Sequence, residues 1–311
     1  MAVLEVKNLS KHFGKVFAVN DISFSVEKRE IFGFLGPNGA GKTTTIRCLM
    51  SFMKPTSGSV SIFGLDPQTK LSEINKKIGY LSGDVRLYDA WTGKDHIDFL
   101  ENLHSQKSKA DELIKKLDFN PNMKFKTLSS GNKQKLGLIL ALMFEPELLV
   151  MDEPTMGLDP LLQAKIYEIL EDVQNRGTTV FMSSHNLSEV ERLCSRVAII
   201  KEGKIVTTEN IQSLKNKRMH VVTVHFNGDY NKNDFLFDGV SIQQELPEGL
   251  ILDVKGDINP LIQQLAKYQL KDLEITHASL EEIFLEFYDS SYSEKQNVLA
   301  KAGYYEGKEA R

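Results

Sequence analysis

The sequence predicts an α/β fold around a parallel sheet, followed by a small α+β domain, and three observations support this. Residues 31–35, 148–151 and 180–182 form short, continuous apolar runs, which are typical of strands buried on both faces of a parallel sheet. A glycine-rich loop at residues 36–44 follows the first run, and apolar residues at helical spacing follow that loop. Beyond residue 214 the pattern changes to short, alternating strand-like segments.

The loop at residues 36–44 has the spacing of a phosphate-binding loop: a glycine, four residues, then Gly-Lys and a hydroxyl residue. Glycines let the backbone approach a ligand closely, and N–H groups at a helix start attract phosphate oxygens. We expect Lys42 to reach the β- and γ-phosphates, Thr43 to hold Mg²⁺ and Thr44 to add a donor. The simpler alternative is a strand-to-helix turn with a solvated lysine. The predicted nucleotide-binding residues here are Gly36, Pro37, Asn38, Gly39, Ala40, Gly41, Lys42, Thr43 and Thr44.

Length and composition indicate an ordinary globular protein. The 311 residues suffice for about two domains, and 41% of them are hydrophobic and 26% charged. A net charge of −4 and a pI of about 6.0 argue against a dedicated nucleic-acid binder. Cys48 and Cys194 are the only cysteines, and the N-terminus lacks the layout of a signal peptide. The longest apolar stretch, at 136–144, is too short to span a membrane, so we expect a cytosolic chain.

The N-terminal part is predicted to form strands. Alternating stretches at residues 3–6 and 22–26 flank a loop that carries Phe13, and further short strands are predicted at 57–64 and 78–81. A phenylalanine in such a loop is more often a packing residue, but beside a nucleotide loop it has a base to stack on.

A helical insert is predicted at about residues 94–135. Apolar residues recur at helical spacing from 94 to 117, with charges between them. A small-residue turn at 128–131 then leads into another helix, with Ser129 as its N-cap. A capped helix start is the simpler interpretation of this turn, although its N–H groups are also able to bind an anion.

Polar residues follow two of the predicted buried strands. Asp152 and Glu153 end the strand at 148–151, and His185 comes after the strand at 180–182. Ligands collect at the carboxyl ends of parallel strands, so these residues are expected to meet the phosphate-binding loop. We expect Asp152 to bind Mg²⁺ through water, Glu153 to polarise the attacking water, and His185 to contact the γ-phosphate.

From about residue 4 to 214 the sequence resembles the ATP-binding subunits of ABC transporters. Residues 36–44 match the family's Walker A motif, 148–153 its Walker B motif, 157–159 its D-loop and His185 its switch histidine. The resemblance implies a P-loop NTPase fold, with a RecA-like core, an antiparallel β subdomain and a helical insert. It also implies a head-to-tail dimer that encloses ATP, with Phe13 stacked on adenine and Asp159 in the D-loop.

The chain departs from the family pattern at two places. The signature LSGGQ reads Leu-Ser-Ser-Gly-Asn at residues 128–132, which retains Ser129 and Gly131 as contacts to the γ-phosphate of the opposite subunit. The family's Gln or Glu after the strand at 78–81 is replaced by Gly83, which has no side chain to bind Mg²⁺. Asp84 is the candidate substitute at the metal; slower or differently coupled hydrolysis is the alternative.

The residues after 214 are predicted to form a separate extension. We expect an α+β domain at 215–289 and a polar tail at 290–311. Strands are predicted at 222–226, 250–254 and 273–276, helices at 261–267 and 279–287. This region is similar to the C-terminal extension of ATPases that serve drug- or polymer-export systems.

The sequence therefore predicts a Mg²⁺-dependent ATPase subunit of an ABC transporter, with Lys42, Glu153 and His185 as its catalytic residues. The resemblance implies an exporter whose integral membrane permease is a separate chain. The ATPase is expected at the inner face of the membrane, paired with itself or with a paralogue. The alternatives are a soluble ABC-type ATPase acting on ribosomes or DNA, an importer subunit, and a regulatory nucleotide-binding module without hydrolysis.

Overall fold

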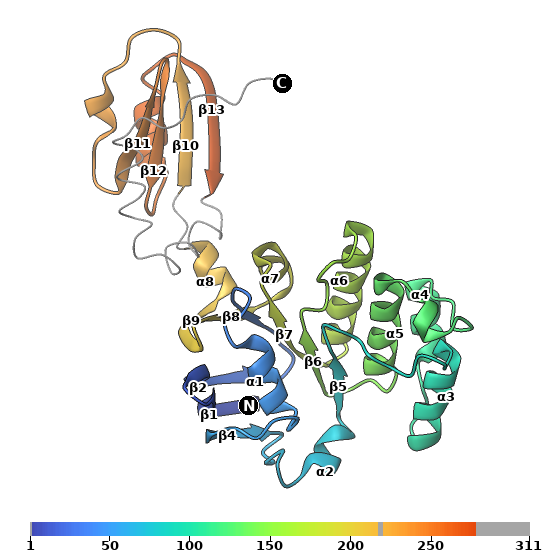
Figure 1. The fold of residues 1–311 in the computed structure, drawn as a ribbon. Coiled ribbons are helices and arrows are strands. Elements are labelled where there is room, and N and C mark those ends of the chain that lie inside the picture. The colour runs from blue at the N-terminus through green and yellow to red at the C-terminus, as the bar shows by residue number, and fades with distance from the viewer. Residues whose placement is uncertain (1, 217–219, 278–311) are drawn as a thin grey trace. The chain divides into compact units, whose positions relative to one another are not determined.

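The computed structural model describes residues 2–216 and 220–277, and the chain divides into two compact units between Ile211 and Gln212 (Figure 1). The predicted boundary at residue 214 lies inside helix α8 (Ile211–Asn216). Each unit has its own hydrophobic core.

A six-stranded sheet forms the centre of the first unit, with the strand order β5-β6-β7-β3-β8-β9. Every neighbouring pair is parallel except β8 and β9, which are antiparallel. The strands are β5 (Ile78–Leu81), β6 (Leu148–Asp152), β7 (Thr179–Ser184), β3 (Ile31–Leu35), β8 (Arg196–Lys201) and β9 (Lys204–Asn210). Residues in β3, β6 and β7 are buried along the whole strand, as their apolar sequences predict. Because β7 lies between β6 and β3, the polar residues that follow these three strands emerge side by side.

Alternate residues of β3 face different layers. Phe32 and Phe34 belong to a cluster of rings with Phe181 of β7, at centroid distances of 6.0 and 5.6 Å from it. On the other face, a Cβ at Gly33 would lie 2.9 Å from Sγ of Cys194. Only glycine lets helix α7 (Leu187–Leu193) and the residue after it pack this closely on the strand.

A three-stranded antiparallel sheet packs on the phenylalanine side of the central sheet, together with α1 (Lys42–Leu49). Its strands, in the order β2-β1-β4, are β1 (Ala2–Phe13), β2 (Val16–Glu27) and β4 (Ser57–Ile62). The helices α6 (Pro160–Asn175) and α7 cover the opposite face, as Figure 1 shows. The result is the layered α/β architecture that the sequence predicts.

The helical insert consists of several short helices that lie together beyond β5 and β6 in Figure 1. After α2 (Leu71–Asn75) come α3 (Gly93–Leu103), α4 (Ala110–Leu117), the 3₁₀ turn η1 (Phe125–Thr127) and α5 (Ser130–Leu142). The helical pattern predicted for 94–117 is formed by two helices, α3 and α4. The first ends because His104 adopts an extended backbone conformation, and a polar loop follows.

The second unit contains a four-stranded antiparallel sheet with the order β11-β12-β10-β13. Its elements are β10 (His220–Phe226), the 3₁₀ turn η2 (Lys232–Phe235), β11 (Val240–Leu246), β12 (Gly249–Val254), α9 (Asn259–Leu265) and β13 (Leu270–His277). Apolar residues from β10, β12, η2 and α9 form its core. The predicted helix at 279–287 and the tail at 290–311 lie outside the described residues.

Candidate nucleotide-binding and catalytic site

The loop at residues 36–44 wraps around the start of α1. Gly41 precedes the helix with a φ of 108°, and a Cβ there would lie 2.3 Å from the carbonyl oxygen of Ala18. A Cβ at Gly36 would lie 2.4 Å from the carbonyl oxygen of Ile200. Both glycines are therefore required by close backbone approach, while residues 37–39 are exposed and leave the loop open to a ligand.

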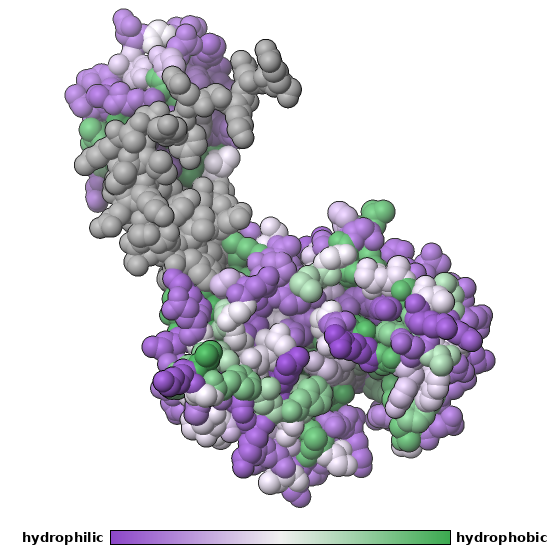
Figure 2. Space-filling model, viewed as in Figure 1, coloured by the Kyte–Doolittle hydropathy of each residue, from purple (hydrophilic) through white to green (hydrophobic). Residues whose placement is uncertain are grey.

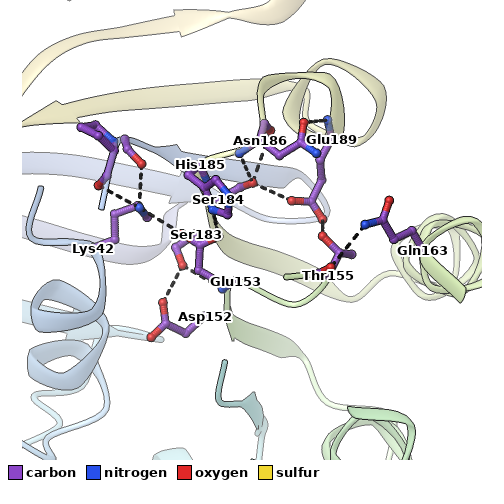
Figure 3. Close-up of polar contacts among 12 residues, drawn as sticks. Lys42, Asp152, Glu153, Thr155, Gln163, Ser183, Ser184, His185, Asn186 and Glu189 are labelled. Atoms are coloured by element: carbon purple, nitrogen blue, oxygen red, sulfur yellow. Dashed lines mark hydrogen bonds and ion pairs between the residues drawn. The ribbon is translucent and has the colours of Figure 1, made fainter. Parts of the chain in front are cut away.

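Lys42 is the buried cation at the centre of this loop. Its side chain is 5% exposed, and Nζ donates hydrogen bonds to the carbonyl oxygens of Gly36 and Pro37 at 2.6 and 3.1 Å. Nζ also lies 3.0 Å from Oε1 of Glu153 (Figure 3). The lysine therefore points along the loop toward the end of β6, where the predicted acidic pair lies.

Glu153 is held at the meeting point of β6 and β7. Its Oε2 lies 2.6 Å from Nδ1 of His185, and its backbone N–H donates to Oγ of Ser183 at 3.0 Å. Glu153 adopts a φ of 50°, a left-handed conformation that is rare for glutamate and costs backbone energy. The carboxylate contacts to Lys42 and His185, together with the backbone contact to Ser183, hold Glu153 in this conformation (Figure 3).

Asp152 and Thr43 provide oxygen ligands of the kind that Mg²⁺ prefers. Asp152 is 5% exposed, and its Oδ1 accepts a hydrogen bond from Oγ of Ser183 at 2.7 Å. Thr43 is exposed in the first turn of α1. Within the described residues, no group of three His, Cys, Asp or Glu side chains is able to hold a metal. This donor set fits Mg²⁺ bound with nucleotide phosphates and water, which is its usual mode.

The residue expected to stack on the base lies at the end of β1. The Phe13 ring is 50% exposed, and Nζ of Lys11 lies 5.2 Å from its centroid. An exposed ring face is available to a planar base.

The remaining predicted contacts lie on other elements of the same chain. Ser129 caps α5, accepting a hydrogen bond from the N–H of Asn132 at 3.4 Å, as predicted. Gly131 lies in the first turn of α5, and a Cβ there would lie 3.3 Å from Leu162. Asp159 caps α6 by accepting from the N–H of Leu162 at 3.0 Å. In the described residues, none of these three forms a hydrogen bond or ion pair with Lys42, Asp152 or Glu153.

The Asp84 carboxylate, predicted at the metal site, forms an exposed ion pair with Arg86. Its side chain is 71% exposed, and Oδ2 lies 2.7 Å from the guanidinium of Arg86. By contrast, a Cβ at Gly83 would lie 2.7 Å from the carbonyl oxygen of Asp152. The backbone at residue 83 thus touches the end of β6, while the Asp84 carboxylate has a different partner.

Comparison with known proteins identifies the family. A family model described as ABC transporter matches residues 19–156. The uncharacterised ABC transporter ATP-binding protein YhcH of Bacillus subtilis (strain 168) is 33% identical over 309 residues, covering 95% of this chain and 99% of that protein. The chain belongs to the ABC transporter ATP-binding proteins. It is the subunit type that binds and hydrolyses ATP.

Further relatives agree with this assignment. The bacitracin transport ATP-binding protein BcrA of Enterococcus faecalis is 36% identical over 217 residues, covering 68% of this chain and 70% of that protein. A solved ATP-binding subunit of an ABC transporter superposes with a TM-score of 0.64 at 27% identity, covering 68% of this chain and 92% of that one. No helix among the described residues of this ABC protein is long and apolar enough to cross a membrane.

Proposed function

We propose that this chain hydrolyses Mg-ATP with Lys42, Glu153 and His185, and that hydrolysis drives export through a separate membrane permease. One observation carries the assignment of these residues. A buried lysine, a glutamate with a strained backbone and a histidine form one connected group at the ends of β3, β6 and β7, through contacts of 3.0 and 2.6 Å.

Each group has a distinct task in this proposal. Lys42 and the backbone N–H groups of residues 36–44 bind the β- and γ-phosphates. Thr43 and Asp152 hold Mg²⁺, which neutralises charge on the phosphates when it is bound. Glu153 accepts a proton from the attacking water, and His185 orients Glu153 through Nδ1 and contacts the γ-phosphate.

A second copy of the subunit, or a paralogue, completes each site. Ser129, Gly131 and Asp159 do not contact the Lys42 group of their own chain, so they are available to the nucleotide of a partner. Exposed apolar side chains lie beside them, with Met156 56% exposed and Leu161 80% exposed. Burial of these side chains on association would favour a closed dimer around two ATP molecules.

A groove on the same unit offers a surface for the permease. It has a volume of about 380 Å³ and lies between strand β5 and helices α3 and α5. Figure 2 shows the molecule hollowed between the regions of α2 and α3, next to this groove. Helix α3 and the segment before it also carry large exposed apolar residues, namely Tyr88, Phe99 and Leu103. Docking of a membrane chain here would hold the ATPase at the inner face of the membrane.

Export is favoured over import by the nature of the relatives. BcrA is named for bacitracin transport, and a Bacillus subtilis relative, 36% identical over 211 residues, is named a linearmycin resistance ATP-binding protein. The C-terminal unit, with its four-stranded sheet, is the extension whose sequence resembles those of export ATPases.

The decisive experiment is an affinity pull-down of the Glu153→Gln chain with Mg-ATP from gently solubilised native membranes. We expect one polytopic membrane protein without its own nucleotide site. The Lys42→Ala chain is the matched control for recovery that does not depend on ATP binding. Recovery of ribosomes or nucleic acid without a membrane protein would instead support the soluble ATPase.

A further inference from the structure

Glu189 on α7 is a buried carboxylate outside the predicted site. It is 2% exposed, and both of its oxygens accept short hydrogen bonds from hydroxyl groups. Oε2 accepts from Oγ of Ser184 at 2.6 Å, and Oε1 accepts from Oγ1 of Thr155 at 2.7 Å (Figure 3). One side chain therefore joins two segments that are far apart in the sequence.

Both segments lie next in sequence to residues proposed to be catalytic, His185 and Glu153. Ser184 is the last residue of β7 and immediately precedes His185. Thr155 lies two residues after Glu153 and begins the turn that leads to Asp159. The carboxyl of Glu189 thus connects the end of β7, before His185, to the segment at residues 154–159. It does so from α7, on the face of the central sheet that α7 covers.

The segment at 154–159 is also held from two other helices. Nε2 of Gln134, a buried residue of α5, donates to the carbonyl oxygen of Pro154 at 2.8 Å. Nε2 of Gln163 on α6 donates to the carbonyl oxygens of Thr155 and Leu158 at 3.3 and 3.2 Å. Of the side chains that hold this segment, Gln134, Gln163 and Glu189, only Glu189 also contacts Ser184, the residue before His185.

A buried carboxyl is a costly choice for packing alone. Desolvation disfavours it, and an apolar side chain of similar size would fill the same space without that cost. Burial raises the pKa of Glu189, although the hydrogen bonds from Ser184 and Thr155 lower it. A carboxyl is needed here if the hydroxyl groups of Ser184 and Thr155 must be held at a fixed separation, because each of its two oxygens accepts one hydrogen bond.

We propose that Glu189 is a positioning residue that couples the His185 loop to the turn carrying Asp159. This rests on the proposed roles of Glu153 and His185. Through Ser184, Glu189 keeps Nδ1 of His185 on the Glu153 carboxylate; through Thr155, it makes that alignment depend on the position of the 154–159 turn. Closure of a partner copy on Asp159 is thereby transmitted to His185.

The test compares two substitutions at Glu189 in the full-length chain. Glu189→Leu, which cannot accept either hydrogen bond, should lower kcat by roughly 10–100-fold, the scale expected for a displaced catalytic group. The KM for ATP should stay within about twofold, because the phosphate-binding loop is untouched. Glu189→Gln, which keeps the shape and one carbonyl acceptor, should restore most of the lost kcat. The control is Glu168→Leu, at an exposed position of α6.

Hydroxyl deletions test the coupling even if Glu189→Leu does not fold. Ser184→Ala and Thr155→Val each break one end of the bridge, so each should lower kcat by several-fold. The double variant should be no slower than the slower single variant, because the bridge is already broken. If the two effects on kcat multiply instead, the residues act independently and the proposal is wrong.

Two further results separate this proposal from the proposed catalytic roles. If Glu153→Gln retains normal hydrolysis, the assignment of Glu153 fails and the role of Glu189 fails with it. If Glu153→Gln is inactive while Glu189→Leu changes only the midpoint of unfolding, Glu189 is a packing residue and only the coupling is overturned.

Discussion

The ammonium group of Lys42 lies 3.0 Å from Oε1 of Glu153, so the phosphate-binding lysine and the proposed general base are partners. Both side chains are largely buried, with 5% and 12% of their surfaces exposed. A γ-phosphate bound to Lys42, as proposed, would compete with this carboxylate and free Oε1. This contact predicts that binding of the nucleotide and release of the proposed base are linked.

Replacing Glu153 with glutamine should separate these two effects. The amide cannot act as a base, so hydrolysis should fall by about 10²–10⁴-fold. The neutral amide also competes less with phosphate for Lys42, so ATP should bind at least as tightly as to the unmodified chain. Phosphate release and equilibrium ATP binding measure the two effects. Weaker ATP binding together with normal turnover would contradict this account.

Replacing Lys42 with alanine should abolish ATP binding, because the buried cation of the loop is lost. It should also lower the free energy of unfolding by about 1–3 kcal/mol, since Oε1 of Glu153 loses its partner. Adding Glu153→Gln should recover part of that stability but none of the binding. Calorimetry measures the affinity for ATP, and denaturant unfolding measures the free energy of unfolding. A double variant no more stable than Lys42→Ala would show that the ion pair contributes nothing.

The β1–β2 hairpin offers a matched pair of exposed phenylalanines. Phe13 is 50% exposed and Phe17 is 56% exposed, but the Phe17 ring lies against His12 with a centroid distance of 5.4 Å. If Phe13 stacks on adenine, Phe13→Ala should weaken ATP binding by about 1–3 kcal/mol, while Phe13→Tyr retains it. Phe17→Ala is the control and should leave the affinity for ATP unchanged. Equal losses from both substitutions would remove Phe13 from the base site.

The central sheet is the part of the fold that is most easily predicted from sequence. Strands β3, β6 and β7 are short and buried on both faces, so their residues are apolar throughout and their polar ends mark the site. Strand β11 was not predicted, because its sequence is largely polar and its residues are mostly exposed. The apolar spacing over 94–117 predicts helical structure but does not mark the loop that separates α3 from α4.

The side chains that support the site are harder to predict. Glu189 occurs in a charged helical segment that is typical of a solvated surface. Its burial arises from Thr155, 34 residues away in sequence, and from Ser184 on a neighbouring strand. The spacing that identifies the phosphate-binding loop is local, whereas a buried polar bridge depends on tertiary packing.

Gly83 aligns with the position at which the resemblance implies a glutamine, or a glutamate in some exporters. Because a Cβ there would lie 2.7 Å from the carbonyl oxygen of Asp152, Gly83→Gln should displace the end of β6. We expect a drop in kcat of about tenfold or more and a loss of about 1–3 kcal/mol in stability. Asp84→Ala, which removes only the exposed pair with Arg86, should leave Mg²⁺-dependent hydrolysis unchanged. Faster hydrolysis by Gly83→Gln, or loss of Mg²⁺ dependence in Asp84→Ala, would contradict this assignment.

The buried carboxyl of Glu189 should make stability depend on pH. Burial raises its pKa above the ordinary value of 4.5, and the negative charge of Glu153 adds to the rise, while His185 and the two hydroxyls oppose it. Burial raises the pKa values of Tyr167 and Cys194 nearby, and the charge of Glu189 adds to both. The folded chain thus holds the Glu189 proton more tightly than the unfolded chain. The resulting stabilisation is complete below the unfolded pKa and is lost as the pH rises through the folded one.

Glu189→Gln removes this titration while keeping the side chain's shape. Its midpoint of thermal unfolding, relative to that of the unmodified chain, should therefore rise as the pH increases above the ordinary carboxyl pKa of 4.5. Glu168→Gln, at an exposed position of the neighbouring helix α6, should show no such trend. A difference that stays constant with pH would mean that Glu189 titrates normally.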